Sequence, residues 1–318
     1  MHTSSLWQRA AAEFLGLFIL TSFGLMTVAT AVTTGAYGLF ELSIAFGLAI
    51  MAIVLVIGAY SGAHINPAIT IALATYGRFA WRDVPAYVTA QVAGGITGSL
   101  VLYWLYSGPI RAFESANDIV RGEPGSALSA MIFFCFAPNP AIAAANGWTD
   151  VISTPMAVAA EAFGTMILAL VLFRMLDPKN GFAPSLKSFA LIIGLTVAGI
   201  IMVLAPLTMS RINPAADLGP RIAAYLLGWG STAFPGVGPA WWVWTVGPIL
   251  GALAGGGISV FMGRFMQKRH EDELALDDSV LGAAVEPIES AHDAHVAPAP
   301  RATASAPSAP SAPHRRSN

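Results

Sequence analysis

Charged residues are scarce in this 318-residue chain, where 11% are Asp, Glu, Lys or Arg and 55% are hydrophobic. With a mean hydropathy of +0.65, the chain has too little polar surface to cover a soluble globule, and its composition is typical of a membrane protein. Neither sign of charge is in excess, since 16 Lys and Arg stand against 18 Asp and Glu. The chain therefore lacks the basic field that attracts nucleic acid, and we expect no nucleic-acid partner.

Cysteine is almost absent. The single cysteine, Cys135, excludes an internal disulfide and a cysteine-based metal cluster, and we interpret it as a buried thiol without a function. Five of the six histidines lie at the N-terminus or in the C-terminal region, where they are not placed to form a metal cluster. We expect neither a metal site nor a cofactor.

Long apolar runs are abundant. A bilayer core about 30 Å thick needs about 20 apolar residues of helix. The run from Ala10 to about Val32 is too long for a signal-peptide core and has no clear cleavage site, so we interpret it as the first membrane span. Five further runs of that size lie near 40 to 60, 84 to 106, 155 to 176, 188 to 207 and 239 to 263. The sequence thus predicts an all-α membrane protein with six spans in residues 1–267, followed by a disordered cytoplasmic tail, rich in Pro, Ala and Ser, at 268–318.

Basic residues predict how the spans are oriented. With six spans, both termini lie on one side of the membrane. Nine basic residues fall in the termini and the even-numbered connections, namely Arg9, Arg78, Arg82, Arg174, Lys179, Lys187, Arg264, Lys268 and Arg269, and four fall on the other side, namely Arg111, Arg121, Arg211 and Arg221. Because Lys and Arg accumulate in cytoplasmic loops, we expect a multi-pass protein of the cell (inner or plasma) membrane with both termini in the cytoplasm.

The two halves of the apolar region, about 8–106 and 155–263, repeat each other. AAEFLGLFILT at 11 to 21 returns as AAEAFGTMILA at 159 to 169, and INPAITIAL after the second span returns as INPAADLGP after the fifth. Asn66 follows Glu13 by 53 residues, and Asn213 follows Glu161 by 52. Because each half has three spans, the second half is inverted relative to the first, an architecture in which sites form at the midplane.

Each repeated Asn-Pro-Ala predicts the start of a short helix deep in the bilayer. The apolar segments that follow Asn66 and Asn213 are about half a membrane long, which suits re-entrant helices. Asn is a favoured helix cap and Pro a favoured first helical residue, and the tripeptides are Asn66, Pro67, Ala68 and Asn213, Pro214, Ala215. Inversion brings the two helix N-termini face to face, each with roughly half a positive charge. Such a pair is typical of a pore that binds passing hydroxyl oxygens through amide N–H groups and rejects cations and protons.

A third copy, Asn139-Pro140-Ala141, lies outside the repeat, in the loop between spans three and four. We expect it to lie outside the central constriction.

At these residues a known family is recognisable. SGAHINPAITIAL and INPAADLGPR, each preceded by an AAE-containing span, resemble the major intrinsic protein family of aquaporins and glycerol facilitators over about residues 8 to 267. The resemblance implies the aquaporin-like fold of six membrane helices and two re-entrant half-helices, a passive channel for small neutral solutes, and a homotetramer with one pore per protomer. Asp217, Arg221 and the segment FAPNPAI are similar to the glycerol-conducting branch, which favours glycerol over water alone.

The resemblance also implies roles for single residues. Glu13 and Glu161 would accept hydrogen bonds from backbone N–H groups of the re-entrant loops, because an unpaired acid inside a span is costly. His64 would line the cytoplasmic half of the pore, in preference to a purely structural place.

The selectivity constriction departs from the family pattern. Its four positions correspond to Phe46, Ile201, Ser210 and Ala216, and the last stands where the family has arginine. Loss of that guanidinium is expected to widen the constriction, weaken cation rejection there and remove hydrogen bonds to solute hydroxyls. Arg211, two residues before Asn213, either points away from the lumen, as its family counterpart does, or turns into the vacated place. The sequence leaves both arrangements open.

Two further patterns concern packing. Trp241, Trp242 and Trp244 are typical of anchors at a membrane interface. Glycines four residues apart, Gly94 with Gly98 and Gly247 with Gly251 and Gly255, predict close helix packing within one protomer.

Four interpretations of the function compete, and the third of them covers both an intramembrane enzyme and a coupled transporter. A passive channel for glycerol, water or both agrees with most of the motifs, and a wider pore for urea, ammonia or uncharged metalloid hydroxides is favoured by Ser210 and Ala216. An intramembrane enzyme would need a nucleophile with a base, or a metal cluster, and the sequence offers none at membrane depth. A coupled transporter would need an ionisable relay, for which the strong candidates, Glu13 and Glu161, are assigned to structure by the resemblance. A non-conducting scaffold would not require both Asn-Pro-Ala segments.

Overall fold

A computed structural model describes residues 4–148, 150–177, 185–236 and 238–265. The predicted tail at 268–318 lies outside the described residues, and so does Lys179. Within the described ranges, every regular element is helical.

Six helices are long and apolar enough to cross a membrane. The first span, Leu6–Thr34, consists of α1 (Leu6–Ile19), a π-helical turn η1 (Leu20–Gly24) and α2 (Leu25–Thr34). The others are α3 (Leu39–Ser61), α5 (Val84–Ala116) with its leading turn η2 (Trp81–Asp83), α8 (Thr154–Met175), α9 (Leu186–Thr208) and a final helix, Val243–Phe265. The six predicted spans are confirmed, and only the third is much longer than expected, since α5 continues through Pro109 to Ala116.

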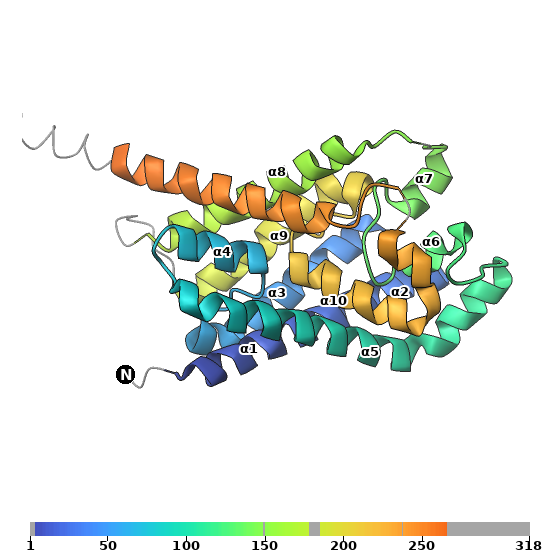
Figure 1. The fold of residues 1–318 in the computed structure, drawn as a ribbon, viewed down its shortest axis with the longest axis horizontal. Coiled ribbons are helices and arrows are strands. Elements are labelled where there is room, and N and C mark those ends of the chain that lie inside the picture. The colour runs from blue at the N-terminus through green and yellow to red at the C-terminus, as the bar shows by residue number, and fades with distance from the viewer. Residues whose placement is uncertain (1–3, 149, 178–184, 237, 266–318) are drawn as a thin grey trace, which may run out of the picture. The chain divides into compact units, whose positions relative to one another are not determined.

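Two shorter helices, α4 (Pro67–Thr75) and α10 (Pro214–Ala224), follow the second and fifth spans. They lie among the long helices (Figure 1), where α4 contacts α10 and both contact α5. Their lengths of 9 and 11 residues are too short to cross a bilayer. The remaining short elements are η3 (Pro124–Ser126), α6 (Ala127–Ala130), α7 (Pro140–Asn146), η4 (Tyr225–Trp229) and η5 (Thr232–Gly236).

Local sequence explains where the spans begin and end. Ser5, Ser153 and Ser185 are the N-caps of α1, α8 and α9, and each side chain accepts a hydrogen bond from a backbone N–H of the first turn. Gly35 and Gly62, which end α2 and α3, have φ angles of 67° and 84°. Glycine adopts this left-handed conformation without steric cost, so the chain leaves the helix there.

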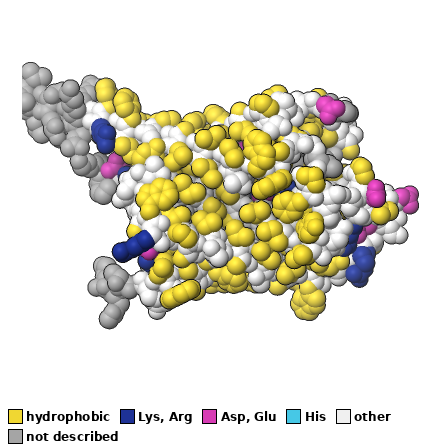
Figure 2. Space-filling model, viewed as in Figure 1, with side chains coloured by type: hydrophobic (Ala, Val, Ile, Leu, Met, Phe, Trp, Pro, Cys, Tyr) yellow, Lys and Arg dark blue, Asp and Glu magenta, His cyan; other side chains and the backbone are white. Residues whose placement is uncertain are grey.

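The outer surface of the bundle is apolar. Figure 2 shows hydrophobic side chains over most of the visible face, with basic and acidic side chains gathered near its two ends. Large exposed side chains include Trp104 at 77%, Val203 at 70% and Phe261 at 69% exposure. A continuous apolar surface of this kind is stable against lipid and unstable in water, so the chain is a multi-pass membrane protein.

Glycines set the close helix contacts. A Cβ on Gly94 would collide with the Phe14 carbonyl of α1, and one on Gly251 would collide with the Ala162 carbonyl of α8. Gly98, Gly247 and Gly255 approach α1 or α8 in the same way. The third span thus packs on the first as the sixth packs on the fourth, and the glycine patterns serve packing within one chain, as predicted.

The prediction for the tryptophan run was wrong for one member. Trp244 is only 1% exposed, and its indole Nε1 donates to the Thr208 carbonyl at 3.0 Å. It therefore packs in the interior at the end of α9. Trp242, which is 40% exposed, remains a candidate for an interface anchor.

Candidate solute pore

The site is built around the N-termini of α4 and α10. Asn66 caps α4, with its Oδ1 accepting from Ala68 N at 2.9 Å, and Pro67 takes the first helical position. Asn213 caps α10, and its Oδ1 accepts from the backbone N–H groups of Ala215 at 3.1 Å and Ala216 at 3.3 Å. Pro214 takes the first helical position. Both tripeptides therefore begin helices, as the sequence predicts.

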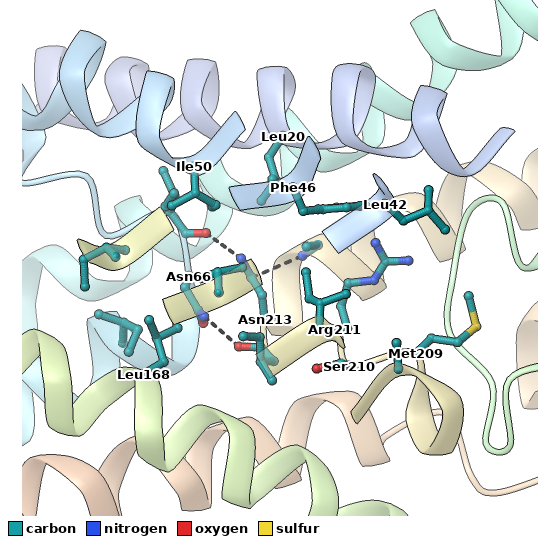
Figure 3. A pocket seen from close by; sticks show the side chains of 18 of the residues that line it. Leu20, Leu42, Phe46, Ile50, Asn66, Leu168, Met209, Ser210, Arg211 and Asn213 are labelled. Atoms are coloured by element: carbon teal, nitrogen blue, oxygen red, sulfur yellow. Dashed lines mark hydrogen bonds between the residues drawn. The ribbon is translucent and has the colours of Figure 1, made fainter. Parts of the chain in front are cut away.

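Each capping asparagine also reaches the opposite loop. Asn66 Nδ2 donates to the Ile212 carbonyl at 2.8 Å, and Asn213 Nδ2 donates to the Ile65 carbonyl at 2.7 Å (Figure 3). These reciprocal bonds hold the two helix N-termini together. A side-chain amide carries two N–H donors, so the cross-link uses one donor of each asparagine.

Buried acids hold the loops that precede the caps. Both Glu13 and Glu161 are fully buried. Glu13 accepts from the backbone N–H groups of His64 at 3.0 Å and Ile65 at 2.6 Å. Glu161 accepts from those of Arg211 at 3.2 Å and Ile212 at 2.7 Å. The same arrangement occurs in both halves, and it satisfies backbone donors that would otherwise be costly at this depth.

The two loops that precede the caps have strained backbones at equivalent residues. Ala63 and Ile65 have φ angles of 47° and 40°, and Ser210 and Ile212 have φ angles of 49° and 47°. A residue with a side chain in this region costs about 1–3 kcal/mol, and such strain persists where the surroundings impose it. Here the acids and the opposite asparagine impose it, through bonds to the backbone of Ile65 and Ile212.

A cavity of about 120 Å³ runs past the paired asparagines. It has room for several water molecules. Of the predicted residues, His64, Asn66, Asn213, Phe46, Ile201, Ser210 and Ala216 line it. Most other lining residues are aliphatic, for example Leu20, Ile50 and Leu168 (Figure 3). The cavity therefore has apolar walls with a small number of polar groups.

His64 sits where this cavity meets a second pocket, which also contains Arg78 and Leu176. Its Nδ1 lies 3.2 Å from Thr70 Oγ1, and its ring packs against Phe79 and Tyr87 with centroids 4.8 and 4.9 Å away. The ring is thus held in one orientation while it lines the cavity.

Asp217 and Arg221 lie behind the cavity wall and hold a loop. They form an ion pair of 2.8 Å with side chains only 4% and 2% exposed. Asp217 also accepts from Cys135 N at 2.8 Å, and Arg221 donates to the carbonyls of Cys135 and Ala233. The Arg221 guanidinium also lies over the ring of Phe134, 4.2 Å from its centroid. The pair thereby fixes the buried segment 133–137 against α10.

The structure brings Arg211 to the cavity. Its side chain lines the cavity and is half-buried. Nε donates to Cys135 Sγ at 3.2 Å, and Nη2 donates to the Phe133 carbonyl at 3.2 Å. The side chain therefore lies at the cavity and does not point away from the lumen. Cys135, which we expected to be a bland buried thiol, is buried but contacts this arginine.

The third Asn-Pro-Ala also begins a helix. Asn139 caps α7, with Oδ1 accepting from Ala141 N at 3.0 Å and Ile142 N at 3.4 Å. Asn139 lines the outer part of the cavity with Met131 and Met209, and it makes no hydrogen bond with the paired asparagines. Asn139 lies outside the central pair, as predicted, yet it belongs to the cavity lining, a place that the sequence did not predict.

One signal in the sequence indicated the place of Arg211. HINPA and RINPA align His64 with Arg211 in the repeat, and the structure gives both residues the same backbone bond to a buried glutamate and a place in the cavity wall. The places of Asn139, Met131 and Met209 had no comparable signal.

Comparison with known proteins agrees with this geometry. Residues 1–258 match the family model described as major intrinsic protein. The chain is 39% identical over 268 residues to the glycerol uptake facilitator protein of Pseudomonas aeruginosa, which covers 83% of this chain and 92% of that protein. It is 34% identical over 262 residues to human aquaporin-9, covering 81% and 83%. The X-ray structure of the aquaglyceroporin from Plasmodium falciparum superposes with a TM-score of 0.67 at 27% identity, covering 80% of this chain and 95% of that chain.

Proposed function

Because the chain belongs to the major intrinsic protein family, we propose that it conducts glycerol and water passively along their gradients and excludes ions and protons. The chain is a channel and not an enzyme, as its family implies. The glycerol assignment takes support from relatives whose names state glycerol uptake.

One observation carries the proposal, namely the reciprocal bonds between Asn66 and Ile212 and between Asn213 and Ile65. They place two helix N-termini against one cavity, where their dipoles sum to a positive potential in a low-dielectric wall. A cation or proton meets this barrier after losing its hydration. A neutral polyol or water exchanges one set of hydrogen bonds for another, so its barrier is lower.

The cavity walls suit a small polyol. Apolar side chains such as Phe46 and Ile201 line the cavity and would contact the carbon atoms of a solute. Each asparagine amide has one N–H that the cross-link does not use, and this donor can bind a hydroxyl oxygen. A solute with both carbon atoms and hydroxyl groups can contact the apolar side chains and the hydrogen-bonding groups at once, so it loses the least free energy when it leaves water.

A wider solute range is the second candidate. Ser210 and Ala216 are small residues at two of the four constriction positions, and they leave room that bulkier side chains would fill. This observation favours entry of urea, ammonia or uncharged metalloid hydroxides beside glycerol.

We assign the channel to residues 1–267 of a protein in the cell membrane with both termini in the cytoplasm. The nine-to-four distribution of basic residues supports this orientation. A homotetramer with one pore per protomer is proposed from family resemblance, and 268–318 is proposed as a cytoplasmic tail.

Stopped-flow light scattering on proteoliposomes, with water, glycerol and urea gradients, tests the function. We expect water and glycerol rates well above those of protein-free vesicles. Ile201→Trp fills the cavity and should bring the glycerol rate close to the protein-free value, whereas Ile192→Trp, which is 38% exposed on the same helix α9, should leave it unchanged. Rates equal to protein-free vesicles for all three solutes would refute the proposal. Equal permeation of all three would favour the wider pore.

A further inference from the structure

Among the described residues that line the cavity, Arg211 is the one arginine or lysine, and the constriction residues Phe46, Ile201, Ser210 and Ala216 line the same cavity. In Figure 3 its side chain extends away from the paired asparagines, on the side of the cavity where Leu42, Phe46 and Met209 are labelled. We propose that Arg211 supplies the fixed positive charge and the hydrogen-bond donors of the selectivity constriction, from a place five residues before Ala216. The proposal deepens the proposed function and rests on it.

The charge of Arg211 is not neutralised by a carboxylate. In the described part of the chain, no ion pair includes Arg211. Glu161 binds its backbone N–H, and Asp217 is paired with Arg221. The guanidinium itself contacts a carbonyl and a thiol. Burial raises the pKa of the Cys135 thiol to about 12, so this partner is neutral at physiological pH. A full positive charge therefore remains at the cavity.

Donors remain for a solute. A guanidinium carries five N–H groups, and the bonds to Phe133 and Cys135 use two of them. The remaining N–H groups have no hydrogen-bond partner among the residues that the structure describes. Because Arg211 is half-buried and lines the cavity, these donors are available to hydroxyl oxygens of a passing solute.

The guanidinium is also held in place. Its two partners belong to the segment 133–137, which the buried pair of Asp217 and Arg221 fixes against α10. The base of the side chain is fixed by Glu161 through the Arg211 backbone N–H. A charge positioned from both ends loses little entropy when it binds a solute, and this is the property that a constriction needs.

The chain thus compensates for Ala216. Pseudo-symmetry assigns His64 and Arg211 to equivalent places, so one half of the pore has an imidazole and the other half a guanidinium. Arg211 restores cation rejection at the constriction, where Ala216 contributes a small side chain to the wall.

Arg211→Gln tests the proposal, because it removes the charge but keeps a polar side chain and the backbone bond to Glu161. Arg111→Gln is the matched control, since Arg111 is exposed on α5 and does not line the cavity. Proteoliposomes with a pH-sensitive dye inside measure proton leak, and the same vesicles measure glycerol flux. We expect Arg211→Gln to raise the proton and Na⁺ leak about tenfold over wild type, with the paired helix N-termini limiting the increase. Glycerol flux should also fall below the wild-type rate, because the guanidinium donors to solute hydroxyls are lost, but it should stay well above that of protein-free vesicles. Arg211→Lys should restore most of the ion exclusion.

Equal leak in Arg211→Gln and Arg111→Gln vesicles, with wild-type glycerol flux intact, would overturn the proposal and leave the channel function standing. A wild-type protein without glycerol or water flux would instead overturn the function itself. If Arg211→Gln and Arg211→Met both fail to give monodisperse protein while Arg111→Gln succeeds, Arg211 is a structural residue and the proposal is also wrong.

Discussion

Glu161 allows the sharpest test of what holds the pore in shape. The side chain is fully buried in α8, and its two carboxylate oxygens accept one backbone N–H each, from Arg211 at 3.2 Å and Ile212 at 2.7 Å. Glu161→Gln keeps the size of the side chain but replaces one acceptor oxygen with an NH₂ donor. One backbone N–H then faces a donor instead of an acceptor.

The structure sets the size of the effect. A buried donor left without its acceptor costs about 1–3 kcal/mol, and the affected N–H belongs to a loop whose Ser210 and Ile212 are already in the left-handed region. We therefore expect Glu161→Gln to lower the free energy of unfolding by about 1–3 kcal/mol. Water flux should fall as well, because Ile212 supplies the carbonyl that Asn66 binds.

Thermal unfolding in detergent, followed by size-exclusion chromatography, measures the first effect, and stopped-flow swelling of proteoliposomes measures the second. Glu41→Gln is the matched control. Glu41 is exposed and accepts a single bond from Gly38 N at 2.9 Å, so its loss should change stability by much less. An unfolding midpoint for Glu161→Gln equal to that of wild type would refute the role of the acid as the acceptor for the second loop.

Three further predictions follow from the packing and the caps. Gly251→Ala should destabilise the protein by about 1–3 kcal/mol, because the new Cβ would collide with the Ala162 backbone. Gly199 has open space around it, so the control Gly199→Ala should be neutral or slightly stabilising. Equal melting curves for the two variants would contradict this prediction. Arg221→Met should cost about 3–5 kcal/mol by leaving Asp217 buried without its cation, and detergent melting that matches wild type would refute that role. Asn213→Ala should remove a helix cap worth about 1 kcal/mol and reduce water flux, so unaltered swelling rates would count against the paired asparagines as part of the solute pathway.

The fold was largely predictable from the sequence because its signals are local or repeated. Six apolar runs match six spans, and the doubled Asn-Pro-Ala predicts two capped half-helices with their prolines in the first position. Each of these features depends on residues close together in the chain. The glycine spacing was equally informative, since Gly251 and its neighbours have no side chain that competes with the facing helix.

The details of the constriction depend on contacts between distant segments, and the sequence did not determine them. Cys135 and Arg211 are 76 residues apart, and their contact requires the loop that Asp217 and Arg221 hold in place. That loop has no periodic pattern from which its path follows. The same limit applies to Trp244, which is buried and donates to the carbonyl of Thr208, 36 residues earlier in the chain.

Passive conduction of an uncharged solute is tested by glycerol efflux from proteoliposomes under imposed gradients. Efflux is followed with an inside-positive potential, with an inside-negative potential, and with a pH gradient of either sign. We expect a rate far above that of protein-free vesicles, and none of these gradients should change it, because no ion moves with the solute. A glycerol rate that follows the proton gradient or the potential, or one no higher than in protein-free vesicles, would contradict it.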